Sequence, residues 1–312
     1  MNKTDLYNKI KNQDITESSA KIYTSNLIKI SKDFNIKLDE NSFQDLEIID
    51  KIKLSDQSEN TKKNKINSII IYLKAFGAPQ NINDRYNDEA DKYTTKINRK
   101  NKKLEKTEKE NKNWVTIDEI KNKISDLKKK IKDDIIINYD YIKNYMKYIL
   151  LNIHIFAPMR NDLSDAVFID YKTFKKNDID KTKNYIIITP KNGCIILYNF
   201  KTFKSKGIQK IDIDDDDLLK ELNKYKSVIN KYKKDNNIIN DWFIFDKKGD
   251  KITRNEYTKL FNEIFDNKKI STTMIRKIIV SNTWNIKEIK KLSDKMQHTP
   301  QQALNNYVKI DK

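Results

Sequence analysis

The stretch between residues 271 and 309 constrains the fold and the chemistry of this chain more than any other. Within it, Arg276 is followed 22 residues later by His298, one of two histidines in the chain, and Tyr307 comes nine residues after His298. A phenol can act as a nucleophile, and a guanidinium can hold a phosphate through two parallel hydrogen bonds. The alternative is a core tyrosine with an unrelated histidine nearby. These three residues alone leave both interpretations open.

A helix is predicted directly after the histidine. Thr299 and Pro300 are typical of a helix start, with Thr as the N-cap and Pro at the first helical position. In such a helix Ala303, Leu304 and Tyr307 share one face. We therefore expect the phenol to point the same way as its apolar neighbours, toward the protein.

The net charge favours a polyanionic partner. The 312 residues include 63 Lys and Arg against 45 Asp and Glu, which gives a net charge of +18. Nucleic acid is the first candidate for such a surface. The alternative is a solvated, lysine-rich surface that reflects a biased genome, which the many Lys, Asn and Ile residues and only 4 Gly and 4 Pro also fit.

Several classes of protein are not indicated. A single cysteine, Cys194, rules out a disulfide framework and is typical of a reducing, intracellular location. No apolar run reaches the ~18 residues of a membrane span, and the N-terminus lacks the apolar region of a signal peptide. Neither a Cys/His cluster nor a phosphate-binding Gly-rich loop is present, so we expect no metal and no cofactor.

Residues 1–80 are predicted to form a helical domain. Two helices are expected, because apolar residues recur at helical spacing after the candidate N-caps. A shorter amphipathic segment covers residues 43–50. The candidate caps are Thr16 for one helix and Asn60 or Thr61 for another, which is expected to end at Gly77 and Pro79.

Residues 81–113 are predicted to be a basic, polar linker. The part from Lys96 to Lys112 has almost no apolar residues. Such a segment serves either as a solvated tether or as a basic strap along a phosphate backbone, and both roles stay open.

Residues 114–312 are predicted to form a second domain. Thr116 and Glu119 form a capping box that opens a helix to about Lys132. A buried helix follows over residues 138–156, and His154 within it is interpreted as a core residue. Short strands are expected at residues 185–189, 194–198, 207–213 and 242–245. The predicted fold class is therefore mainly α with a small antiparallel β-sheet.

Arg160 follows the buried helix at a corner marked by Pro158. A buried guanidinium needs an anionic partner. Asp162 or Asp165 can supply it in a purely structural role. The functional alternative is a bound phosphate, with Asp162 orienting the guanidinium.

Two charged clusters need separate interpretations. The turn before the third strand carries Lys201, Lys204 and Lys206, which are either simply exposed or chemically active. The acidic run at residues 214–217 is better explained by the positive end of the helix predicted after it than by a metal site, because consecutive carboxylates cannot all face one ion.

Taken together, these motifs resemble the signature of the tyrosine recombinases, the phage-integrase family. The family pattern H-x-x-R, G-H and a Tyr nine residues after that His is matched by Thr273 to Arg276, by Gln297 and His298, and by Tyr307. Arg160 resembles the first catalytic Arg of the family. An Asp two residues after it, rather than a Glu three residues after it, is closer in style to integrases of eukaryotic viruses and mobile elements.

The resemblance implies an activity and a set of roles. It implies a site-specific recombinase or integrase that cleaves and rejoins double-stranded DNA through a 3′-phosphotyrosine, in a tetramer and through a Holliday junction. Residues 1–80 would be the core-binding domain and residues 114–312 the catalytic domain. The implied catalytic residues are Arg160, Lys201, Thr273, Arg276, His298 and the nucleophile Tyr307, with Asp162 in support and Lys204 and Lys206 as rivals of Lys201.

The chain also departs from the family pattern. Thr273, Lys277 and Gln297 replace the usual His, His and Gly, so we expect reduced rather than absent activity. Five residues follow Tyr307, which leaves a C-terminal docking helix very short or absent and puts the cyclic tetramer in question. The alternatives are a type IB topoisomerase, for which the interval from Arg276 to His298 is short, and a catalytically impaired DNA-binding protein. A metal-dependent transposase is disfavoured.

Overall fold

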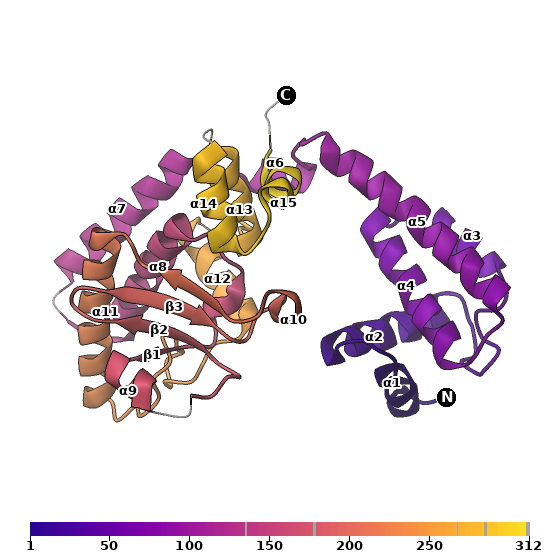
Figure 1. Cartoon of the computed structure of the whole chain (residues 1–312), viewed down its shortest axis with the longest axis horizontal. Coiled ribbons are helices and arrows are strands. Elements are labelled where there is room, and N and C mark those ends of the chain that lie inside the picture. Colours follow the sequence, from indigo (N-terminus) through magenta and orange to yellow (C-terminus); the bar gives the residue numbers. More distant parts are fainter. Residues whose placement is uncertain (135, 177–178, 267, 284–285, 310–312) are drawn as a thin grey trace. The chain divides into compact units, whose positions relative to one another are not determined.

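The computed structural model describes residues 1–312 except residues 135, 177–178, 267, 284–285 and 310–312. The chain divides into an N-terminal unit, residues 1–103, and a C-terminal unit, residues 104–312 (Figure 1). The predicted mainly helical α+β class is confirmed: helices dominate both units, and one four-stranded sheet lies in the C-terminal unit. Among the described residues, no helix combines the length and apolarity that crossing a lipid bilayer requires.

The N-terminal unit is a set of helices around one apolar core. Its helices are α1 (Lys3–Lys11), α2 (Glu17–Asp33), α3 (Glu47–Leu54), α4 (Glu59–Ala75) and α5 (Gln80–Lys102). Thr16 caps α2 as predicted, by accepting a hydrogen bond from the N–H of Ser19. Ser58, rather than Asn60 or Thr61, caps α4, because its hydroxyl accepts from the N–H of Thr61 and the helix begins earlier than expected.

The linker predicted over residues 81–113 is wrong for most of its length. Residues 80–102 form α5, whose Tyr86, Ala90 and Tyr93 lie one helical turn apart and are buried in the core of the N-terminal unit. The hydroxyl of Tyr86 donates to the carbonyl of Phe43 at 2.9 Å. One narrow apolar stripe thus anchors a helix that is otherwise polar. The rest of the expected linker, from residue 104, belongs to the C-terminal unit.

The C-terminal unit surrounds the buried helix α8. Its helices are α6 (Glu108–Asn113), α7 (Ile117–Asp133), α8 (Tyr139–Phe156), α9 (Tyr171–Lys176), α10 (Phe203–Lys206), α11 (Asp216–Asp235), α12 (Arg254–Ile264), α13 (Thr272–Ser281), α14 (Ile286–Met296) and α15 (Pro300–Tyr307), with a 3-10 turn η1 (Asn161–Leu163). The capping box of Thr116 and Glu119 at α7 is confirmed. Asn138 caps α8 by accepting from the N–H of Tyr141.

The sheet is mixed rather than antiparallel. Its order is β1 (Ala166–Ile169), β2 (Asn184–Ile188), β3 (Gly193–Leu197) and β4 (Gln209–Asp212). β2, β3 and β4 pair in antiparallel fashion as predicted, but β1, a strand the sequence did not reveal, lies parallel to β2. The predicted strand at residues 242–245 is wrong: Trp242 makes an isolated bridge to Val167, although Phe243 to Phe245 are buried.

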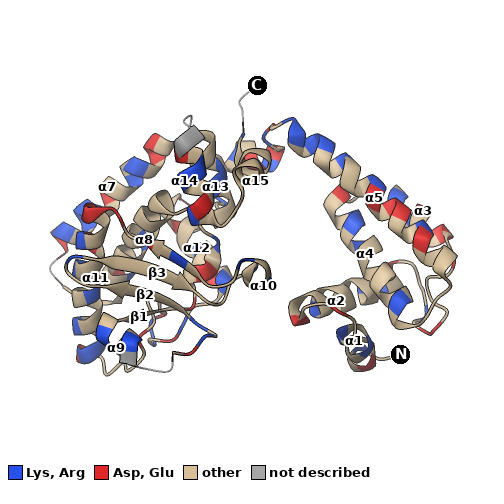
Figure 2. Ribbon diagram, in the orientation of Figure 1, with Lys and Arg blue, Asp and Glu red and all other residues tan. Residues whose placement is uncertain are grey.

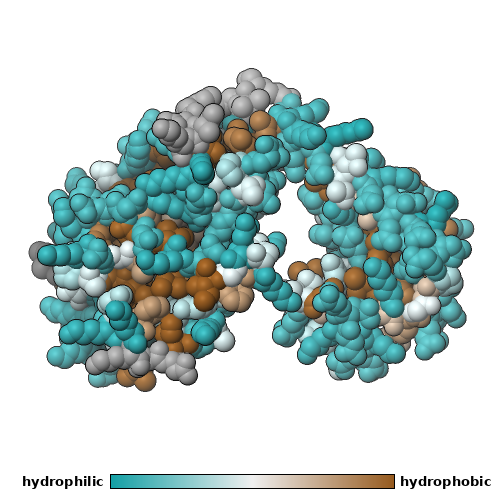
Figure 3. Space-filling view, viewed as in Figure 1, coloured by the Kyte–Doolittle hydropathy of each residue, from teal (hydrophilic) through white to brown (hydrophobic). Residues whose placement is uncertain are grey.

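Alternation along the strands gives the sheet two apolar faces. On β2, Ile186 and Ile188 pack into the main core, whereas Tyr185 and Ile187 belong to a smaller cluster that Phe174 of α9 joins. Figure 3 shows apolar residues in view over this part of the C-terminal unit. Lys and Arg, by contrast, are spread along many helices of both units, including α5, α7 and α11 (Figure 2).

Candidate active site

Tyr307 lies at the end of α15. The helix starts as predicted, with a capping box in which Thr299 N–H donates to Gln302 Oε1 at 3.0 Å and Gln302 N–H donates to Thr299 Oγ1 at 3.1 Å. Ala303 and Tyr307 are buried against Val280 and Met296, as the shared face predicted. Leu304 is an exception, with 37% of its surface exposed, because it lies at the solvent edge of that face.

His298 is placed by the way α14 ends. The His298 N–H donates to Ser293 O at 2.9 Å, and the Gln297 N–H donates to Asp294 O at 3.0 Å. This pair of bonds is the Schellman motif, whose first residue beyond the helix adopts the left-handed conformation. Gln297 has φ +59°, so it occupies a position that favours glycine. The Gly expected at this position in the family pattern is thus explained by backbone geometry.

Two side chains converge on one nitrogen of His298. The Tyr307 hydroxyl lies 3.2 Å from His298 Nε2, and Arg160 Nη2 lies 3.3 Å from the same atom. A guanidinium can only donate, so Nε2 is the acceptor and carries no proton. Burial first, then the charges of Arg160 and Arg276, lower the pKa of His298 to about 4. The imidazole is therefore neutral at neutral pH and able to accept the phenolic proton.

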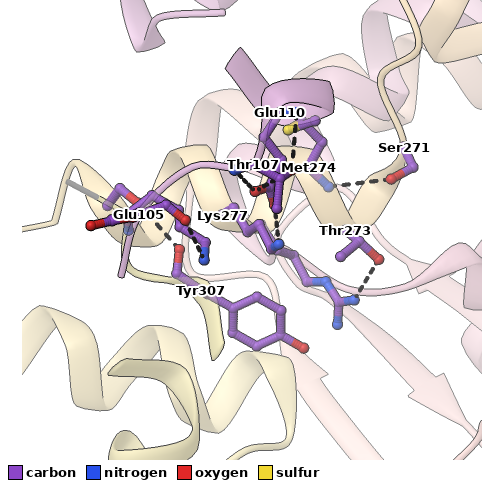
Figure 4. A network of polar contacts seen from close by, with 11 residues as sticks. Glu105, Thr107, Glu110, Ser271, Thr273, Met274, Lys277 and Tyr307 are labelled. Atoms are coloured by element: carbon purple, nitrogen blue, oxygen red, sulfur yellow. Dashed lines mark hydrogen bonds and ion pairs between the residues drawn. The ribbon is translucent and has the colours of Figure 1, made fainter. Parts of the chain in front are cut away.

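Arg276 extends from α13 over the phenol ring, with its guanidinium carbon 4.8 Å from the ring centroid of Tyr307. It is 3% exposed. Nη2 donates to Thr273 Oγ1 at 3.1 Å (Figure 4), but Nε and Nη1 have no partner among the residues that the structure describes. Burial lowers the pKa of Arg276 from its ordinary value, although not enough to discharge a guanidinium. Two buried donor nitrogens of the guanidinium beside the phenol therefore have no acceptor among the described residues.

Asp162 is a carboxyl group on which the charges of three arginines act. It is buried, and burial raises the pKa of its carboxyl while the charges of Arg160, Arg254 and Arg276 oppose that rise. Its backbone is fixed because the side-chain amide of Asn184, on β2, donates to Asp162 O at 2.7 Å. The charges of all three arginines thus favour the ionised form of this buried carboxyl.

Asn161 joins the Arg160 corner to two helices, which sequence reasoning missed. Its side-chain amide donates to Arg254 O at 3.0 Å, at the start of α12, and its Oδ1 accepts from Thr272 Oγ1 at 2.6 Å, at the start of α13. The sequence did contain one signal that could have pointed to the start of α12. The C-terminal unit has three arginines among many lysines, and Arg254 is one of them. All three act on Asp162.

The lysines after β3 lie in and around the short helix α10. Lys201, Lys204 and Lys206 are all exposed. The charge of Lys206 contributes to lowering the pKa of His298, after burial and the charges of Arg160 and Arg276.

The other histidine and the acidic run have structural roles. His154 is fully buried, and its Nδ1 donates to Leu150 O at 2.8 Å, as expected for a core residue. Burial lowers the pKa of His154 to about 4. Asp215 caps α11, and Asp214 pairs with Lys291 at 2.8 Å, which agrees with the helix-end interpretation of this run.

Comparisons with known proteins give structural likenesses but no sequence match. No family model and no curated protein matches the sequence. A crystal structure of XerA recombinase is similar with a TM-score of 0.41 and 12% sequence identity, covering 100% of this chain and 95% of that chain.

Proposed function

We propose that the chain is a tyrosine recombinase that cuts and rejoins double-stranded DNA through a 3′-phosphotyrosine at Tyr307. The observation that carries the proposal is Arg276, a buried guanidinium with two unpaired N–H groups directly over the phenol ring. Unpaired buried donors are costly, and the cost is removed when an anion enters. A phosphate at this place would lie beside the Tyr307 oxygen.

The cleavage step follows from the contacts of Tyr307. Its oxygen forms a bond to phosphorus while the bond from phosphorus to the 5′ oxygen breaks. The phenolic proton passes to His298 Nε2, which is 3.2 Å away. An ordinary phenol ionises only near pH ~10, so transfer of the proton to the neutral His298 during attack spares the phenol from ionising first. Rejoining is the reverse, with a 5′ hydroxyl as the nucleophile.

Arg160 and Arg276 stabilise the charge that builds up on the phosphate. Both present fixed N–H groups, and Arg160 exchanges its contact with His298 for a phosphate oxygen when DNA binds. Removal of one such donor typically costs ~3–4 kcal/mol of transition-state stabilisation. Thr273 holds Arg276 Nη2 at 3.1 Å, so a hydroxyl suffices at a position where the family usually has His.

The departing 5′ oxygen needs a proton, and a lysine of the α10 turn is the donor in this proposal. Lys201 matches the family pattern in sequence. Lys206 is an alternative, because its charge contributes to lowering the pKa of His298. We therefore assign the general acid to Lys201 and keep Lys204 and Lys206 as alternatives.

Double-stranded DNA is the proposed partner of both units. The charge of +18 favours a polyanion. The N-terminal unit would serve as the core-binding domain and residues 104–312 as the catalytic domain. Strand exchange through a Holliday junction in a tetramer belongs to the same proposal.

The test is a covalent-trapping assay without metal ions. Wild type, Tyr307→Phe and the control Tyr257→Phe are mixed with labelled duplex and Holliday-junction DNA in EDTA and run on a denaturing gel. Tyr257 is a matched control because it is a buried tyrosine whose hydroxyl has no partner among the described residues. A shifted band in wild type and control, absent in Tyr307→Phe, is expected. Adducts that persist in Tyr307→Phe would refute the assignment.

The same proteins separate recombinase from topoisomerase. Relaxation of supercoiled plasmid by one protomer, without exchange between two duplexes, would favour the topoisomerase. Exchange of strands between labelled duplexes, dependent on Tyr307, would support the recombinase.

A further inference from the structure

The residues after the nucleophile are tied to the body of the C-terminal unit at two places. The Lys309 N–H donates to Ser281 Oγ at 2.7 Å, and Ser281 Oγ donates to Tyr307 O at 3.2 Å. The ammonium of Lys309 donates to Glu105 O at 3.2 Å. Ser281 ends α13, the helix that carries Arg276, whereas Glu105 precedes α6. The chain beyond Tyr307 is thus held between α13 and the segment before α6.

Glu110 of α6 is the anion at the centre of this region. Its Oε2 accepts from the Thr107 N–H at 2.8 Å and from Thr107 Oγ1 at 3.0 Å, which completes a capping box. Its Oε1 forms an ion pair with Lys277, the residue after Arg276. Figure 4 shows Glu110, Thr107 and Lys277 in one network, with Glu105 and Tyr307 beside it. Glu110 is 7% exposed, so this pair is shielded from solvent.

Two lysines would repel each other without that carboxylate. Burial lowers the pKa of Lys309, the charge of Lys277 lowers it further, and Glu110 opposes both effects. Lys277 follows a phosphate-binding arginine, and Lys309 lies two residues after the nucleophile. The ion pair with Glu110 holds the side chain of Lys277. The charge of the same carboxylate favours the Lys309 ammonium, which itself donates to Glu105 O.

We propose that residues 105–110, through Glu110, form a clasp that positions Tyr307 within its own protomer. The inference rests on the proposed function and deepens it: Glu110 helps to hold the nucleophile at His298 through contacts within the same chain. Glu110 is a positioning residue. It acts on Tyr307 through Lys309 and Lys277, and it touches neither the phosphate nor the reacting atoms.

The test removes the charge of Glu110 but keeps the capping box at the start of α6. Glu110→Gln retains an N3 side chain that can complete the capping box, but leaves Lys277 and Lys309 without an anion. Glu119→Gln is the matched control, because Glu119 occupies the same N3 position in the capping box of α7. Single-turnover adduct formation is measured on saturating duplex. A misplaced reacting group costs up to ~10²-fold in rate, so we expect a loss of about tenfold or more in Glu110→Gln and none in Glu119→Gln.

A second substitution distinguishes the clasp from simple repulsion between the lysines. In Glu110→Gln with Lys277→Gln the repulsion is gone but the ion pair is not restored, so adduct formation should stay as slow as in Glu110→Gln. Recovery of the rate in the double variant, or no effect of Glu110→Gln alone, would overturn the clasp.

Hydrogen exchange provides a readout that does not depend on activity. The amide of Lys309 is protected by its bond to Ser281 Oγ, and its exchange should accelerate about tenfold or more in Glu110→Gln and stay unchanged in Glu119→Gln. Unchanged exchange in Glu110→Gln would refute the clasp whatever the enzyme does. Adducts that survive Tyr307→Phe would instead refute the proposed function and leave the exchange result to judge the clasp.

Discussion

The left-handed backbone at Gln297 predicts that a Gly variant at this position is more stable than an Ala variant, the reverse of the usual order in a helix. At ordinary helical positions, replacement of Ala by Gly destabilises a protein by about 1 kcal/mol. At position 297, where φ is +59°, a side chain with a Cβ costs ~1–2 kcal/mol, whereas the greater freedom of Gly in the unfolded chain returns ~0.5–1 kcal/mol. Gln297→Gly should therefore be about 1 kcal/mol more stable than Gln297→Ala. Both variants lack the buried Gln side chain, so the cost of losing it cancels when the two are compared.

The measurement is urea unfolding of the full chain followed by tryptophan fluorescence. Trp114 and Trp242 lie in the C-terminal unit, and the sequence of residues 1–103 has no tryptophan, so the signal reports on the unit that contains Gln297. The same two substitutions at Lys290, an exposed position within α14, should give the ordinary order, with Ala more stable than Gly. If Gly were less stable than Ala at both positions, the reasoning on the Schellman motif would be refuted.

The remaining predictions concern titration, the core and the phosphate clamp. With the pKa of His298 at about 4, kcat/KM for adduct formation should not fall through loss of this base between pH 7 and pH 5, and an essential base titrating near 6.5 would contradict this. Burial lowers the pKa of Lys233 to about 8. Since the unfolded chain then binds more protons, urea-measured stability should rise from about pH 8 to about pH 10, and Lys233→Met should abolish that rise. Arg276→Lys should slow adduct formation by roughly 10²–10³-fold in single-turnover assays, because an ammonium cannot copy the planar donors; a loss under threefold would count against the clamp. DNA affinity should fall steeply with salt, and a flat salt titration would contradict the polyanion partner.

The error at α5 shows how local composition misleads. The sequence from Lys96 onward is almost purely polar, and residues 81–91 are polar as well, which suggests that no apolar period is present. Tyr86, Ala90 and Tyr93 nevertheless have helical spacing, and their burial in the N-terminal core decides the structure. A helix needs only one apolar stripe to dock, so the spacing of a few apolar residues outweighs the mean polarity of the segment.

Strand β1 was missed for a different reason. It has four residues, and its parallel partner β2 begins 18 residues after β1 begins. A parallel pair requires a crossover, here with α9 between the strands, and no turn signal announces it. The antiparallel pairs β2–β3 and β3–β4 were predictable because short turns join consecutive strands.

The sequence by itself determined the elements that depend on neighbouring residues. The N-caps at Thr16, Thr116 and Thr299 and the order of Arg276, His298 and Tyr307 were all readable, because capping and helical spacing act within a few residues of the chain. Only the tertiary structure decided which side chains meet. Arg160 and His298 are 138 residues apart and yet lie 3.3 Å from each other. The unpaired donors of Arg276, the left-handed Gln297 and the pairing of Glu110 with Lys277 follow from how α6, α13, α14 and α15 pack, since the energy of such contacts depends on burial and distance, which no local pattern records.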